Sequence, residues 1–153
     1  MKALILILTT VISLSCSDDN NSQNTNIEFT EIAEGFLGAD GAEGIPEQNI
    51  VIDNEADWKD LKTKMNTNVN TTESFSETEI DFSLYMIIAS FSDIKNYGGL
   101  SLKVEKVINN PENIIVNIKQ VVSSDKYVTF NINQPYYIAK IPRSDLPVIF
   151  ELY

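Results

Sequence analysis

The distribution of apolar residues after residue 26 predicts a chain that is mostly β-strand. Polar and proline-containing segments separate apolar runs of strand length at 27–33, 49–52, 85–91, 100–105, 114–122, 127–132, 137–141 and 148–152. The run at 100–105 alternates apolar and polar residues, as a strand with one buried face does, whereas 85–91 is continuously apolar and reads as a central strand. Short, closely spaced strands favour a mainly β (α+β) fold, an antiparallel β-sandwich or partly open barrel, forming a single domain over 27–153.

One segment has helical rather than strand periodicity. Trp58, Leu61 and Met65 recur at i, i+3 and i+7, which places them on one face of a helix. Asp53 or Asn54 precedes the segment as a suitable N-cap, and acidic residues in the first turn and lysines in the last suit the helix dipole. We expect one short amphipathic helix whose apolar stripe packs in the core and does not form a cofactor site.

A different apolar segment opens the chain. Residues 3–12 have the length of a signal peptide and are too short for the ~20 residues of a membrane-spanning helix. The segment closes on Ser13-Leu14-Ser15-Cys16, which resembles the lipobox of bacterial lipoproteins, with Ser13 standing where leucine is usual. The resemblance implies a signal peptide over 1–15 and lipid attachment at Cys16. The alternatives are an ordinary secretory signal with an unmodified thiol, or a buried N-terminal strand.

The residues after Cys16 predict a tether. Residues 17–26 contain no apolar side chain, so burial cannot offset the entropy of ordering them, and we expect residues 16–26 to be a lipidated, disordered linker. Ser17-Asp18-Asp19-Asn20 is similar to the acidic export signal of surface lipoproteins. That similarity implies an outer-membrane lipoprotein exposed on the cell surface, and the alternative is a plain solvated linker.

Composition removes several classes of function. The 153 residues include no histidine and one cysteine, which excludes imidazole-based catalysis, imidazole metal ligands and an internal disulfide. The net charge of −11 argues against a nucleic-acid partner. Asp40-Gly41-Ala42-Glu43 lacks the carboxylate spacing of a calcium loop and predicts a solvated loop. No carboxylate pair stands out, and we expect no catalytic residue, no metal and no cofactor.

Several segments, in order, resemble the C-terminal domain of PrcB-type proteins, lipoprotein subunits associated with bacterial surface proteases. They are Ile50-Val51-Ile52 with Asp57-Trp58-Lys59-Asp60-Leu61, Asp81-Phe82-Ser83 before 85–91, Tyr97-Gly98-Gly99 before 100–104, and Gln134-Pro135-Tyr136-Tyr137 through Lys140-Ile141-Pro142-Arg143. The similarity is best over 82–150 and extends from about residue 29. It implies a non-catalytic subunit that binds or stabilises a protease complex.

Five residues are candidates for a binding surface. Gly98 and Gly99 predict a turn in which glycine supplies a positive φ, and such a turn can also present Tyr97. Tyr136 and Tyr137 are adjacent in a predicted strand, so their side chains point to opposite faces. We therefore expect one of the two tyrosines in the core and the other exposed, where tyrosine is a favoured interface anchor.

The leading functional hypothesis is a lipid-anchored envelope protein, held at the membrane by its anchor, that is not an enzyme and binds a protein partner. The resemblance implies that this partner is a protease. Two alternatives remain open. A glycan- or small-ligand-binding surface module would need an aromatic-lined pocket, for which Trp58 and the six tyrosines are the available residues. Inhibition of a protease, in place of its stabilisation, is the other.

Overall fold

The chain forms a β-sandwich with a helical layer on one side. The computed structural model describes residues 24–38, 41–96, 99–122 and 132–153. The outer sheet has the order β1 (Thr25–Asn26), β5 (Leu100–Asn109), β6 (Ile114–Val122), β8 (Val148–Leu152), and the central sheet has the order β2 (Thr30–Leu37), β7 (Gln134–Pro142), β4 (Tyr85–Phe91), β3 (Gln48–Ile52). All pairings are antiparallel except β6 with β8, which is parallel. The predicted sandwich is confirmed, and the described strands do not close into a barrel.

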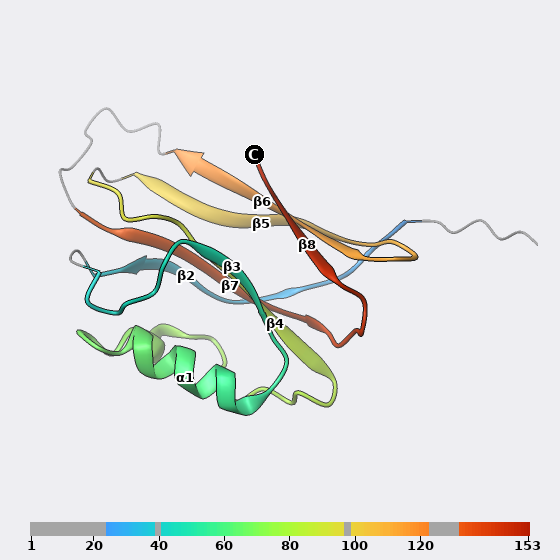
Figure 1. Cartoon of the computed structure of the whole chain (residues 1–153), viewed down its shortest axis with the longest axis horizontal. Helices are drawn as coiled ribbons and strands as arrows, with labels where there is room; N and C mark the ends of the chain where they lie inside the picture. Colours follow the sequence, from blue (N-terminus) through green and yellow to red (C-terminus); the bar gives the residue numbers. More distant parts are fainter. Residues whose placement is uncertain (1–23, 39–40, 97–98, 123–131) are drawn as a thin grey trace, which may run out of the picture.

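The central sheet is covered on both faces. Figure 1 shows the outer sheet on one side of it and the helix α1 (Glu55–Met65) on the other. The core between the two sheets contains Met86, Ile88, Leu102, Val104, Val116, Ile118, Tyr137, Ala139 and Ile141. The core under α1 contains Trp58, Leu61, Met65, Phe75, Ile87, Ala89, Phe91, Tyr136 and Ile138. Because β4 and β7 contribute alternate residues to the two cores, both read as continuous apolar runs.

The helix α1 begins and packs as its sequence predicts. Asn54 is the N-cap, and its side-chain oxygen accepts a hydrogen bond from the Asp57 amide at 3.0 Å. The stripe of Trp58, Leu61 and Met65 is buried. The short 3-10 helix η1 (Thr71–Ser74) follows, and the chain then crosses the sheet face to reach β4.

The segment between η1 and β4 is fastened to its neighbours at several points. The Thr78 carbonyl accepts hydrogen bonds from the Trp58 indole at 2.9 Å and from the Lys62 ammonium at 2.8 Å. Glu77 forms an ion pair with Lys140 of β7, whose ammonium also lies 4.8 Å from the ring centroid of Tyr85. These contacts hold the helical layer against the central sheet.

Outside β4, β6 and β8, the strand boundaries differ from the sequence-based expectation. β3 begins one residue earlier, β5 continues to Asn109 where 105 was expected, and β7 spans Gln134–Pro142 where 137–141 was expected. β1 pairs with Ile108 and Asn109, so the sheet begins two residues before the expected start of the domain at 27. β2 spans Thr30–Leu37 where 27–33 was expected, because its later residues pair with the first residues of β7. In both places backbone pairing extends the strand where the side-chain pattern carries no signal. Of the expected strand at 127–132, only Ile132 lies within the described residues.

Candidate functional site

The expectation that Tyr136 or Tyr137 is exposed is wrong. Their exposed fractions are 2% and 1%, because Tyr136 points into the core under α1 and Tyr137 points into the core between the sheets. Adjacent strand residues do face opposite sides. In a sheet covered on both faces, however, neither side reaches solvent. Sequence reasoning assumed a sheet with one solvated face, and the third layer removes it.

The ionisation of both tyrosines reflects this burial. Burial raises the pKa of the Tyr137 hydroxyl well above its usual value, and the neighbouring carboxylates of Glu31 and Glu34 raise it further. Burial also raises the pKa of Tyr136, against a smaller opposing effect of its hydrogen bond with Ser74. Both hydroxyls are therefore protonated at neutral pH, and both residues belong to the core, although Tyr136 also lines an open hollow beside η1.

Gly99 is the one other binding candidate that the structure describes. It is exposed, directly precedes β5 and has a φ of 89°, in the left-handed region that favours glycine. This conformation agrees with the predicted turn. Tyr97, Gly98 and the proposed lipid attachment residue Cys16 lie outside the described residues. The structure thus brings none of the described candidates together into one surface.

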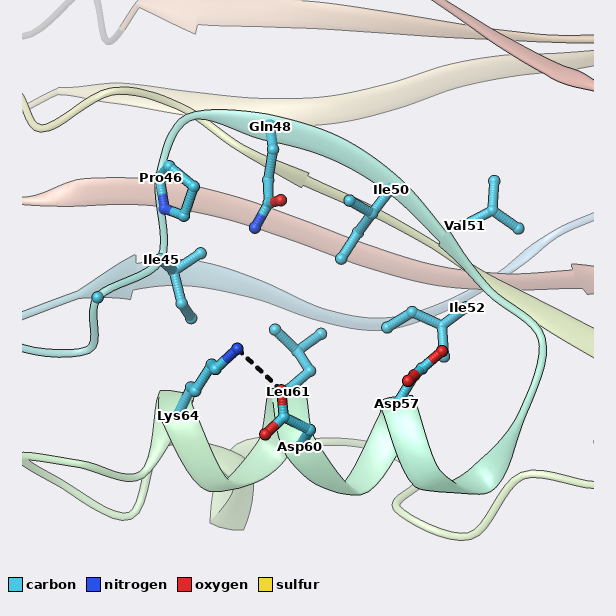
Figure 2. Close-up of a pocket in the computed structure, with 11 residues that line it drawn as sticks. Ile45, Pro46, Gln48, Ile50, Val51, Ile52, Asp57, Asp60, Leu61 and Lys64 are labelled. Carbon is cyan, nitrogen blue, oxygen red and sulfur yellow. Dashed lines mark ion pairs between the residues drawn. The ribbon is translucent and has the colours of Figure 1, made fainter.

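A groove lies between β3 and α1, and we call it the edge groove. It has a volume of about 280 Å³ and is lined by Gly44, Ile45, Pro46, Gln48, Ile50, Val51, Ile52, Asp57, Asp60, Leu61 and Lys64. Figure 2 shows β3 along one wall and α1 along the other, with side chains from both elements directed into the space between them. The groove is an elongated feature between a strand and a helix.

The two walls supply different chemistry. The α1 wall consists of Asp57, Asp60, Leu61 and Lys64, which lie at i, i+3, i+4 and i+7 and therefore share one helix face. Leu61 is buried at the base of this wall, and Asp60 and Lys64 form an exposed ion pair at 2.8 Å. From the opposite wall, Gln48, Ile50 and Ile52 point toward α1 (Figure 2). The groove thus has an apolar floor and a charged helical rim.

β3 is an edge strand without the usual protective features. It pairs only with β4 in the sheet order, in a continuous register that shows no bulge. Its five residues include no charged side chain and no proline. The opposite edge of the same sheet, β2, carries Glu31 and Glu34 and a register shift between Glu31 and Ala33. Charges, prolines and bulges are the features by which natural edge strands resist further pairing.

A second hollow, of about 350 Å³, lies around the chain between β7 and β8. Its lining includes Arg143, the cation in the last segment of the family resemblance. The Arg143 guanidinium donates hydrogen bonds to the Asp53 carbonyl at 2.9 Å and the Phe82 carbonyl at 2.8 Å, and it lies 3.9 Å from the Asp53 carboxylate. These contacts tie three loops together. Arg143 is therefore a structural cross-link more than an anion-binding group.

Glu43 departs from the expectation of a solvated loop. Its side chain is buried, and one carboxylate oxygen accepts hydrogen bonds from the Gly38 amide at 3.1 Å and from the Asn68 side chain at 3.2 Å. The carboxylate thus joins the start of this loop to the segment after α1. Asp40 lies outside the described residues, and within those residues no three acidic or cysteine side chains gather as metal ligands would.

Trp58, the first aromatic candidate for a ligand pocket, is not accessible to a ligand. Trp58, the only tryptophan, is fully buried and stacks on Phe75 with 5.9 Å between ring centroids. The edge groove has no aromatic lining residue. An exposed aromatic ring is found elsewhere: Phe36 is 49% exposed and, with Tyr136, lines an open hollow of about 590 Å³ between β2 and η1.

The edge groove is the feature that sequence reasoning missed. The periodicity of α1 identified its buried stripe, and the adjacent face of Asp57, Asp60 and Lys64 could have been read from the same pattern. β3 is an edge strand because it pairs only with β4, which lies more than thirty residues later in the chain. No local pattern carries that information.

Comparison with known proteins adds no relative. No family model, no curated protein and no solved structure matches this chain. In the part of the chain that the structure describes, no helix combines the length and the apolar character needed to cross a membrane.

Proposed function

We propose that this chain is a lipid-anchored protein of the cell envelope that binds another protein and has no catalytic activity of its own. One observation carries the proposal. An apolar segment of signal-peptide length ends at the only cysteine of the chain, and ten residues without an apolar side chain follow it. Two or three acyl chains at this cysteine would anchor the protein stably, since each buried methylene contributes about 0.8 kcal/mol.

The tether supports a role at a distance from the membrane. Thr25, the first residue of β1, comes nine residues after Cys16. At no more than about 3.5 Å per residue, such a linker lets the domain lie up to about 30 Å from the anchor. β1 also belongs to the outer sheet, whereas the edge groove lies at the edge of the central sheet. The groove is thus free to face a partner.

The resemblance to PrcB-type proteins suggests which partner this is. It favours a surface protease complex that the chain stabilises. The edge groove supports a binding role because its walls offer apolar surface, an ion pair and an unprotected strand edge. An assay of protease activity with and without the chain distinguishes the two roles: stabilisation preserves the activity, whereas inhibition lowers it.

Replacing the anchoring cysteine tests the proposal. The variant Cys16→Ser should move from the membrane fraction to the aqueous fraction when cells are broken, and it should no longer incorporate a radiolabelled fatty acid. Ser22→Ala, in the tether, is the matched control and should behave as the native chain does. If Cys16→Ser partitions with membranes as before, lipidation does not hold the protein there. Crosslinking on intact cells should recover one specific partner, and recovery of none would remove the binding role.

A further inference from the structure

We propose that the edge groove binds an extended, basic segment of the partner protein, which adds to β3 as a further strand of the central sheet. This inference rests on the proposed function and names the site and the chemistry of the partner. Three features of the described residues carry it: the free edge of β3, the shape of the groove, and its charge.

The free edge supplies the backbone contacts. In an antiparallel pair, only alternate residues direct their N–H and C=O groups at the partner strand. The remaining groups of β3 face away from β4, at the edge of the sheet. An added strand would satisfy these groups, as in other cases where a peptide extends a sheet. The absence of charge, proline and bulge along Gln48–Ile52 makes this edge competent to pair.

The groove supplies side-chain contacts of matching length. At about 3.4 Å per residue, the five residues of β3 offer room for a segment of four or five residues. Alternate side chains of an added strand would point toward α1, where Ile50 is only partly buried and Leu61 and Ile52 form the apolar floor. Small or β-branched apolar residues at alternate positions fit this floor.

The charge of the region indicates a basic segment. On the α1 wall, Lys64 is paired with Asp60, and Asp57 stands at the end of the groove near Ile52 (Figure 2). Residues 43–65, which include both walls, carry six acidic and three basic residues, and all three lysines lie on α1. A second copy of the chain would bring the same acidic surface to the groove, so repulsion disfavours self-pairing through β3. A lysine or arginine in the added strand would instead meet Asp57.

Hydrogen exchange tests the inference directly. The probe is a capped peptide of sequence Lys-Thr-Val-Thr-Val-Thr-Lys, whose valines and lysines share one strand face. It is added to the purified full chain in detergent, with exchange followed by mass spectrometry. Residues 48–52 should exchange more slowly with the peptide present, in a saturable way, while the outer sheet is unchanged. The peptide with glutamate in place of both lysines is the control and should give no protection at the same concentration.

Two variants with matched controls locate the contact. Val51→Lys places a charge on the edge of β3, at a residue whose side chain is 39% exposed, and should weaken peptide binding more than about tenfold. Val69→Lys alters an exposed valine outside the groove and should bind as the native chain does. Asp57→Asn should weaken binding about two- to fivefold, as expected for one exposed ion pair, whereas Glu55→Gln should not.

The outcomes separate this inference from the proposed function. Absence of protection at millimolar peptide, protection confined to other segments, or equal binding by Val51→Lys would each overturn strand addition. Concentration-dependent dimerisation that Val51→Lys abolishes would replace the basic partner by a second copy. If crosslinking recovers the same partner with the native chain and with Val51→Lys, the binding function stands and the groove is not its site.

Discussion

At the scale of single residues, Trp58 is the side chain on which the helical layer most depends. It is fully buried, stacks on Phe75 and donates a hydrogen bond to the Thr78 carbonyl. Trp58→Ala removes this packing and should lower the free energy of unfolding by about 3–5 kcal/mol. Trp58→Phe should lower the free energy of unfolding by less, because a phenyl ring still fills part of the space of the indole and Lys62 still donates to the Thr78 carbonyl. Urea denaturation followed by circular dichroism measures both.

The neighbouring residue provides the control for Trp58. Lys59 is exposed on the same helix, so Lys59→Ala should change the free energy of unfolding by no more than about 0.5 kcal/mol. A cost below about 1 kcal/mol for Trp58→Ala would mean that the helical layer contributes little to the stability of the sandwich.

Tyr137 should make the protein sensitive to alkali. Its pKa is raised in the folded chain, mainly by burial. Above a pH of about 10, the unfolded chain releases the tyrosine proton and the folded chain retains it, so the unfolded state gains stability. The free energy of unfolding should therefore be insensitive to this group below pH 9 and fall by about 1.4 kcal/mol per pH unit above pH 10. Urea denaturation at a series of pH values measures this slope.

The variant Tyr137→Phe isolates this contribution. Above pH 10 its free energy of unfolding should fall less steeply than that of the native chain, by about 1.4 kcal/mol per pH unit. The other titrating groups are the same in both proteins and contribute equally. At neutral pH it should differ from the native chain only through the lost interaction of the hydroxyl with Glu31. Equal slopes for the two proteins would show that Tyr137 ionises in the folded state.

The same residue shows the limit of sequence reasoning at this scale. The alternation rule placed Tyr136 and Tyr137 on opposite faces correctly, yet it could not show that both faces are covered. Cover on the second face comes from α1 and the segment after it, which lie more than fifty residues earlier in the chain. The burial of a strand residue depends on which elements pack on its sheet, and the residues next to it in the sequence do not show which elements these are.

At the scale of elements, the start of α1 depends on one side chain. The Asn54 oxygen accepts the Asp57 amide hydrogen bond, and the Asn54 amide group donates to the Asp57 carboxylate at 2.8 Å. Asn54→Ala should lower the free energy of unfolding by about 1 kcal/mol, as the loss of an N-cap does. Asn54→Ser keeps a capping oxygen and should cost less. Urea denaturation of the two variants decides this, and equal stability of Asn54→Ala and the native chain would contradict the capping role.

Elements with strong local patterns were predicted well, and their pairing was not. The helix, its cap and its buried stripe follow from periodicity and capping chemistry, and β4, β6 and β8 have the predicted bounds. The parallel pairing of β8 with β6 and the edge position of β3 were not predicted. Strand order results from contacts between distant segments. The edge groove depends on that order, because it forms beside the edge strand β3. This is why the edge groove could not be predicted from the sequence.

At the scale of the whole molecule, charge and architecture coincide. The segment 17–81, with 16 acidic and 3 basic residues, supplies α1 and both edge strands of the central sheet, β2 and β3. Residues 82–153, with 6 acidic and 7 basic residues, supply the interior strands of that sheet and most of the outer sheet. The acidic residues therefore lie mainly on the side of the molecule formed by α1 and the two edges of the central sheet, and the edge groove lies at one of those edges. A basic segment should be attracted to this side before it makes any contact.

This attraction predicts a rate that depends on salt. The screening length falls from about 30 Å at 10 mM salt to about 8 Å at 150 mM. The association rate constant of the lysine-containing peptide should therefore fall about tenfold over this range, and its dissociation rate constant should change less. Biolayer interferometry on the full chain measures both rates. A peptide with serine in place of both lysines is the control, and its association rate should be nearly independent of salt. Equal salt dependence of the two peptides would show that the acidic side does not steer the partner to the groove.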